Sequence, residues 1–220
     1  MEILKKNIAT GEPIAHVTYK IEQIDGSYST SATTDSAGRI FLDSIPAGSY
    51  RITEKNVPSH VILSEIPQEV YLEAGCTRTV TFFNAVKPSL TILKRNSVTG
   101  DPLSNAKFHI YYGSDNTTTG EINFLGVFTT ASDGKITLTD VNRGWYKLVE
   151  ESAPKGFGIQ DSGVTEFYLE ANTSKTVTVD NVPHSALVVY KYDAKTGKGL
   201  EGCRFELRYL GGGTSGTGGT

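Results

Sequence analysis

Apolar and polar residues alternate along most of the chain with the period of two that is typical of β-strands. Segments rich in Val, Ile, Thr, Tyr and Phe are separated by turn signals roughly every eight to twelve residues, and no segment has a helical period. Asp25-Gly26 and Asp133-Gly134 are two of these turn signals and predict β-hairpins. The pattern therefore predicts an all-β protein made of β-sandwiches.

The strand pattern repeats along the chain. A first-strand string occurs three times, and two further strings occur twice each. These strings are EILKKNIATGEPI at 2–14, TILKRNSVTGDPL at 91–103 and VVYKYDAKTGKGL at 188–200, then GSYRITE at 48–54 and GWYKLVE at 144–150, then TVTFFN at 79–84 and TVTVDN at 176–181. The repetition predicts one domain at 1–86, a second at 87–183, and at 184–220 the truncated start of a third repeat with a Gly-rich tail.

In each complete repeat, three polar residues fall in phase with apolar neighbours on the same strand face. Lysine, glutamate and asparagine are rarely buried without a partner, so the alternation predicts a buried polar cluster in each repeat. Glu151 and Asp180 lie beside the second set but point to the opposite strand face. The two predicted clusters are Lys5, Glu54 and Asn84 in the first repeat, and Lys94, Glu150 and Asn181 in the second.

The three strings together resemble the Cna B-type (SpaA-like) domains of Gram-positive surface proteins and pilins. The shared pattern is K-x-N/D-x-x-T-G-x-P-L, then G-x-Y-x-L/I-x-E, then a terminal T-V-x-V/F-x-N, and it covers nearly the whole chain. The resemblance implies tandem prealbumin-like, inverse immunoglobulin-type β-sandwiches. It also implies a spontaneous isopeptide bond between the first-strand lysine and the last-strand asparagine, promoted by a buried acid.

By this resemblance, Lys5 would join Asn84 with Glu54 as the acid, and Lys94 would join Asn181 with Glu150 as the acid. The chemistry needs these residue types: an apolar core favours the neutral, nucleophilic amine and the neutral carboxyl that can carry a proton, and the carboxamide is the electrophile. Folding would supply the effective molarity. The alternative is a hydrogen-bonded polar cluster without a covalent link.

The repeats differ in how well they match the family pattern. The second repeat keeps the motif A-P-x-G-Y/F at 153–157, whereas the first has Val-Pro-Ser-His-Val at 57–61, so the first cross-link is the weaker prediction. Lys191 occupies the lysine position of the third repeat, whose glutamate and asparagine strands are missing. We therefore expect Lys191 to remain an unmodified amine in a segment that folds poorly.

Composition narrows the classes of function. The net charge of −3 is scattered, which argues against nucleic acid as a partner. No apolar stretch is long enough for membrane insertion, and neither a signal peptide nor a sorting signal is visible in what reads as a fragment. Cys76 and Cys203 are predicted to be free thiols, and the four histidines lack metal-ligand spacing, so neither a metal nor a cofactor is expected.

These observations favour a structural stalk segment of an extracellular, cell-wall-anchored adhesin, with neighbouring repeats of the same parent protein as its partners and any host ligand unknown. A turnover enzyme is not expected, because an isopeptide-forming triad reacts once. Two alternatives remain open. One is a ligand-binding adhesin module that uses the inserted loop at Gly113–Asn123 and the aromatic residues flanking it. The other is an accessory β-sandwich of an extracellular enzyme.

Overall fold

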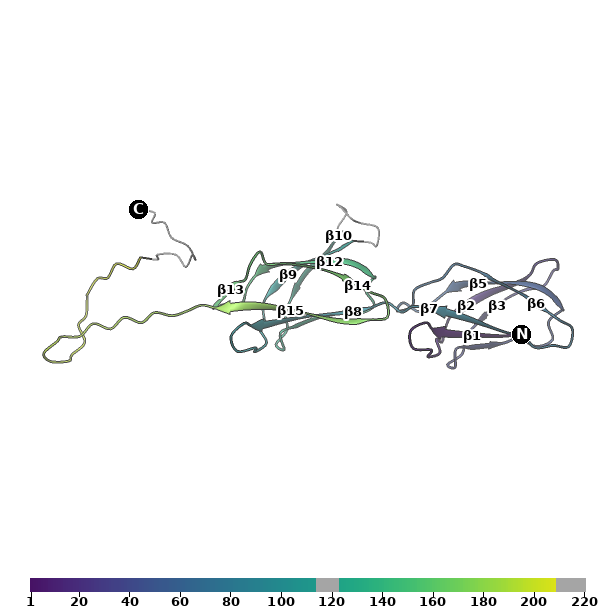
Figure 1. Cartoon of the computed structure of the whole chain (residues 1–220), viewed down its shortest axis with the longest axis horizontal. Coiled ribbons are helices and arrows are strands. Elements are labelled where there is room, and N and C mark those ends of the chain that lie inside the picture. The colour runs from purple at the N-terminus through teal and green to yellow at the C-terminus, as the bar shows by residue number, and fades with distance from the viewer. Residues whose placement is uncertain (114–122, 209–220) are drawn as a thin grey trace. The chain divides into compact units, whose positions relative to one another are not determined.

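The computed structural model describes residues 1–113 and 123–208, and it divides the chain into two compact units. The larger unit, Met1–His184, consists of two successive β-sandwiches and confirms the all-β prediction (Figure 1). Among the described residues, no helix is long and apolar enough to cross a membrane. Most of the inserted loop of the second repeat, residues 114–122, lies outside the described residues.

The first sandwich has a three-stranded sheet in the order β4-β1-β7 and a four-stranded sheet in the order β3-β2-β5-β6. The first and last strands, β1 and β7, are parallel neighbours, whereas the other pairs are antiparallel. The strands are β1 (Glu2–Asn7), β2 (Thr18–Gln23), β3 (Ser29–Thr33), β4 (Arg39–Phe41), β5 (Gly48–Asn56), β6 (Gln68–Leu72) and β7 (Thr79–Asn84).

The second sandwich repeats this topology with sheets in the orders β11-β8-β15-β13 and β10-β9-β12-β14. Its first and last strands, β8 and β15, are again parallel neighbours (Figure 1). The strands are β8 (Ser89–Asn96), β9 (Lys107–Gly113), β10 (Asn123–Thr129), β11 (Lys135–Leu138), β12 (Gly144–Ser152), β13 (Phe157–Ile159), β14 (Val164–Leu169) and β15 (Ser174–Pro183).

Each sandwich has its own core between its two sheets. In β1, β7, β8 and the middle of β12, buried residues alternate with more exposed ones, as the sequence pattern predicts. The first core includes Ile3, Tyr19, Ile52 and Phe82, and the second includes Ile92, Phe108 and Leu148. These apolar walls surround the polar side chains that share their strand faces.

The turn predictions have different outcomes. Asp25-Gly26 lies between the paired strands β2 and β3, so this hairpin is confirmed. The hairpin predicted at Asp133-Gly134 is wrong, because β10 pairs with β9 while β11 pairs with β8 in the other sheet. Gly134 has a φ of 72°, and a Cβ there would lie 2.7 Å from the backbone oxygen of Lys94. The glycine therefore lets a turn between the two sheets pack against the lysine strand.

The second unit begins at Ser185, and its described residues, 185–208, form no strand. An isolated bridge joins Tyr192 to Gly199, as bridges join Lys6 to Pro13 and Arg95 to Pro102 in the two sandwiches. The described part of this segment therefore forms the turn that follows the lysine strand in the two sandwiches, but it does not form the sheets. Lys191 is exposed there, unlike its two counterparts.

Candidate functional site

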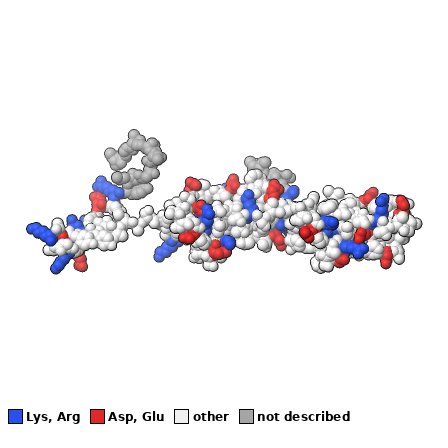
Figure 2. All heavy atoms as spheres, turned by 60° about the horizontal axis from the view of Figure 1, so that its bottom comes forward, with Lys and Arg blue, Asp and Glu red and all other residues white. Residues whose placement is uncertain are grey.

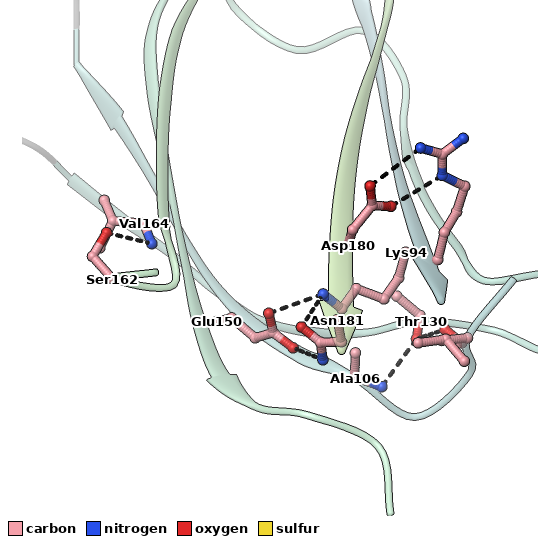
Figure 3. A network of polar contacts seen from close by, with 10 residues as sticks. Lys94, Ala106, Thr130, Glu150, Ser162, Val164, Asp180 and Asn181 are labelled. Carbon is pink, nitrogen blue, oxygen red and sulfur yellow. Dashed lines mark hydrogen bonds and ion pairs between the residues drawn. The ribbon is translucent and has the colours of Figure 1, made fainter. Parts of the chain in front are cut away.

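The parallel pairing of β8 and β15 determines where Lys94 and Asn181 lie. Lys94 is opposite Val179, and Asn181 is opposite Asn96, so the two residues are displaced by two positions along the pair. A displacement of two keeps both side chains on the same face of the sheet. Glu150 comes from β12 in the facing sheet, so the three residues meet inside the sandwich (Figure 3).

The second cluster is a closed triangle of polar contacts. The Nζ of Lys94 is 3.0 Å from Glu150 Oε2 and 2.5 Å from Asn181 Oδ1, and Asn181 Nδ2 donates to Glu150 Oε1 at 2.7 Å (Figure 3). Lys94 and Asn181 are fully buried, and Glu150 is 6% exposed. The amine and the carboxamide are therefore in direct contact, with one carboxyl group bonded to both.

The first cluster contains the equivalent residues in a more open arrangement. Lys5 Nζ is 2.6 Å from Glu54 Oε2, and Asn84 Nδ2 donates to Glu54 Oε1 at 2.5 Å. Among the described residues, no partner lies within hydrogen-bond distance of the buried Asn84 Oδ1. Glu54 thus bonds to both partners, while the amine does not contact the carboxamide oxygen as it does in the second cluster.

Burial favours the neutral form of both lysine amines. It lowers the pKa of Lys5 and of Lys94, and their hydrogen bonds and charge interactions with Glu54 and Glu150 oppose this effect only in part. A lower pKa increases the fraction of neutral amine, which is the nucleophilic form. Aromatic rings form part of each pocket: Lys5 Nζ lies 5.9 Å from the ring centroid of Phe82, and Lys94 Nζ lies 6.0 Å from that of Phe108.

The family model of SpaA, a prealbumin-like fold domain, matches residues 1–86 and 88–183. The chain belongs to this SpaA family. No curated protein matches the chain.

The solved structures to which the chain is similar include three bacterial proteins. The Bacillus anthracis TIE protein is 21% identical with a TM-score of 0.42, over 83% of this chain and 33% of its own. A streptococcal ancillary pilin is 21% identical with a TM-score of 0.40, over 84% of this chain and 62% of its own. The shaft pilin SpaA from Lactobacillus rhamnosus GG is 16% identical with a TM-score of 0.46, over 86% of this chain and 98% of its own. The chain therefore spans less than two thirds of the first two proteins.

The neighbouring acidic residues of the second SpaA domain lie outside the cluster, as their strand phase predicts. Glu151 is exposed and its Oε2 lies 3.3 Å from Nε2 of His109. Asp180 accepts hydrogen bonds from the guanidinium of Arg95 at 3.1 and 3.2 Å, away from the triangle (Figure 3). Side-chain alternation thus distinguishes the buried acid from its neighbours.

The segment at which the first SpaA domain departs from the family motif makes equivalent backbone contacts. Val61 N donates to Pro58 O, as Phe157 N donates to Pro154 O. Val61 also forms a bridge with Val86, two residues beyond β7, at the place where the second domain pairs β13 with β15. The altered motif therefore leaves the asparagine end of the first sandwich closed in the same way.

Lys191 lies in a turn that matches those after the other two lysine strands. The Oδ1 atom of Asp193 accepts from the N–H groups of Lys195 and Thr196, and these bonds, with one from the Thr196 hydroxyl, lower the pKa of Asp193. In the first sandwich, the Oδ1 atom of Asn7 accepts from the N–H groups two and three residues further on. The turn therefore needs only its local sequence, whereas burial of the lysine needs the rest of a sandwich.

Two kinds of buried residue beside the clusters are absent from the sequence predictions. Tyr19 donates a hydrogen bond to Glu54. The hydroxyl groups of Thr34 and Thr130 each accept from one backbone N–H and donate to one backbone carbonyl. The positions of the two threonines within their repeats correspond, which is a signal that alignment of the repeats could have provided. Tyr19 is in phase with Ile21 and so resembles an ordinary core residue.

The cysteines and histidines lie apart from the clusters. Cys76 and Cys203 are both exposed, and neither forms a disulfide within the described residues. Within 1–113 and 123–208, no group of three or more His, Cys, Asp or Glu side chains could hold a metal ion. On the face seen in Figure 2, basic and acidic side chains are interspersed over the two sandwiches.

Proposed function

We propose that each complete SpaA domain forms an intramolecular isopeptide bond, Lys5–Asn84 in the first sandwich and Lys94–Asn181 in the second. The main support is the buried triangle of Lys94, Glu150 and Asn181, in which the amine contacts the carboxamide and one carboxyl bonds to both. A polar triangle held only by hydrogen bonds would leave an amine and a carboxyl group in an apolar core, which is costly. The reaction consumes the amine, converts the primary carboxamide into a secondary amide and releases ammonia.

The reaction balances with the groups present. After a proton passes from the lysine ammonium to the glutamate, the neutral Nζ attacks Cγ of the asparagine, while the carboxyl group lies against the Nδ2 that will leave. The Nζ–Cγ bond forms, the Cγ–Nδ2 bond breaks, and the glutamate proton leaves with Nδ2 as ammonia. The glutamate then takes up the proton that the Nζ loses. The reaction occurs once per domain, so Glu54 and Glu150 promote a self-modification and not a turnover.

We infer that the chain is a structural stalk segment of an extracellular surface protein of the pilin or adhesin type. The bond joins the first strand to the last in each sandwich, which are the strands through which a pulling force enters and leaves. The partners are then neighbouring repeats of the same protein. The turn at Lys191 supports the interpretation of residues 184–220 as the beginning of a third repeat, with Lys191 unmodified in this chain.

Isosteric variants of the two acids test the assignment. We expect Glu54→Gln and Glu150→Gln each to abolish one cross-link and leave the other, because the amide cannot take the lysine proton. Glu151→Gln is the matched control, since that residue is exposed and adjacent to Glu150. Peptide mapping of the purified, folded chains measures the result. Retention of the linked Lys94–Asn181 peptides at wild-type levels in Glu150→Gln would contradict the assignment.

A further inference from the structure

The two clusters differ at the position that faces the glutamate from the adjacent strand. Tyr19 of β2 is opposite Glu54 of β5, and Phe108 of β9 is opposite Glu150 of β12. Both aromatic residues are buried. The two domains therefore offer a natural comparison in which one hydroxyl group is present in the first cluster and absent from the second.

Tyr19 gives Glu54 an additional hydrogen-bond donor. Its hydroxyl donates to Glu54 Oε2 at 3.1 Å, the same oxygen that Lys5 Nζ contacts at 2.6 Å. The backbone N–H of Ser64 and the Nδ2 of Asn84 donate to the other oxygen, Oε1. The carboxyl group of Glu54 thus faces Lys5 from β1, Tyr19 from β2, Asn84 from β7 and an N–H group from the segment between β5 and β6.

The hydroxyl of Tyr19 keeps its proton under all ordinary conditions. Burial, and next the negative charge of Glu54, raise the pKa of Tyr19 far above its usual value. A carboxylate is an acceptor only, and each donor bonded to it favours its charged form. Within the described part of the chain, the carboxyl group of Glu150 accepts hydrogen bonds from Lys94 and Asn181 alone. The charged form of Glu54 therefore has more hydrogen-bond donors than that of Glu150.

We propose that Tyr19 is a positioning residue that slows formation of the first cross-link by holding Glu54 as a carboxylate paired with the Lys5 ammonium. This proposal rests on the isopeptide function proposed above. Attack on Asn84 requires a proton to move from Lys5 Nζ to Glu54, and the Tyr19 hydrogen bond stabilises the state before that transfer. The unpartnered Asn84 Oδ1 agrees with this order, because Lys5 is bonded to Glu54 and not to the carboxamide oxygen.

The experiment follows both cross-links in time on the full chain. The chain is made by cell-free synthesis, translation is stopped, and samples held from mildly acidic to mildly alkaline pH are quenched in denaturant. Peptide mapping then gives the linked fraction at Lys5–Asn84 and at Lys94–Asn181 separately. The variants are Tyr19→Phe, Phe108→Tyr, and Tyr50→Phe as the matched control. Tyr50 is a buried tyrosine of the same core whose hydroxyl donates to the backbone of Pro46.

We expect Tyr19→Phe to accelerate the first cross-link about tenfold, the effect of removing one hydrogen bond to a charged group. The acid limb of its rate profile should move towards neutral pH, because the carboxylate then accepts a proton more readily. Phe108→Tyr should slow the second cross-link by a similar factor, and Tyr50→Phe should leave both rates unchanged. A purely structural role of Tyr19 would not shift the pH profile.

An unchanged or slower first cross-link in folded Tyr19→Phe would overturn the proposal, as would an equal acceleration in Tyr50→Phe. If Tyr19→Phe does not fold, an unchanged second rate in folded Phe108→Tyr overturns it. Failure of the underlying function looks different. In that case the wild-type chain folds but never forms linked Lys5–Asn84 peptides, whatever residue occupies position 19.

Discussion

At the scale of single residues, we expect the buried amine of Lys94 to influence how the second domain responds to pH before the proposed cross-link forms. Glu150→Gln is expected to trap this state, in which Lys94 remains a free amine. Burial lowers its pKa in the folded chain below the ordinary value of 10.5. Between these two values the unfolded chain binds a proton that the folded chain does not.

The free energy of unfolding of Glu150→Gln should therefore rise with pH through this window and fall as the pH decreases. In the wild-type chain Lys94 has no free amine once it is linked, so the plot of unfolding free energy against pH should lack this rise. Both chains contain the same tyrosines, so the titration of tyrosine cannot cause the difference. Denaturant unfolding of both chains over an alkaline pH series measures the difference. Parallel profiles for the two chains would show that Lys94 carries no such shift.

Strand phase in the sequence identifies which polar residues are buried. Glu150 lies in phase with the buried residues of β12, whereas Glu151 lies in phase with its more exposed residues, so burial follows the strand pattern. The contact between Tyr19 and Glu54 could not be predicted in this way. A tyrosine in an apolar phase has the same pattern whether its hydroxyl meets a carboxyl group or a backbone carbonyl, as in Tyr50.

At the scale of strands and turns, a buried threonine in each sandwich links two connecting segments. In the second sandwich, Thr130 follows β10 and bonds to the segment between β8 and β9. Thr130 accepts from the N–H of Ala106 at 3.0 Å and donates to the carbonyl of Leu103 at 2.8 Å (Figure 3). Thr130→Val keeps the shape but leaves both backbone groups unpaired. We expect a loss of roughly 1–3 kcal/mol in the free energy of unfolding for each unpaired group.

Thr129→Val is the control for this prediction, because Thr129 is exposed and adjacent in sequence. Denaturant unfolding of the two variants and the wild type, all with the cross-link verified by mass, measures the difference. Equal stability of Thr130→Val and Thr129→Val would mean that the two backbone groups find other partners.

The strands themselves follow from periodicity, but their assignment to sheets does not. The turn at Asp133-Gly134 has the local sequence of a hairpin, yet β10 and β11 belong to different sheets, and Gly134 packs against the backbone of Lys94. That contact is with a strand far away in the sequence. The parallel pairing of β8 with β15 brings the lysine and the asparagine together. Local pattern does not predict this pairing, which could be expected only from the resemblance to a known family.

At the scale of the whole molecule, the proposed cross-links would determine how the chain bears force. A bond between Lys94 and Asn181 closes a segment of 87 residues. In Glu150→Gln, unfolding of the second sandwich under tension should release roughly 300 Å of chain, at about 3.4 Å per residue. The wild type should release none from this segment, because the covalent bond carries the load.

Single-molecule pulling from the two ends of the chain measures this difference. The first domain provides a control within the same molecule, since Glu150→Gln leaves its acid unchanged. If the second sandwich releases the same length of chain in the wild type and in the variant, the proposed mechanical role of the cross-link is wrong.

The most direct test of the central claim is the intact mass of the purified, folded wild-type chain, followed by peptide mapping. We expect a mass lower than that of the sequence by two molecules of ammonia, with linked peptides containing Lys5 with Asn84 and Lys94 with Asn181, and a free amine at Lys191. A folded chain with the full mass of its sequence would contradict it.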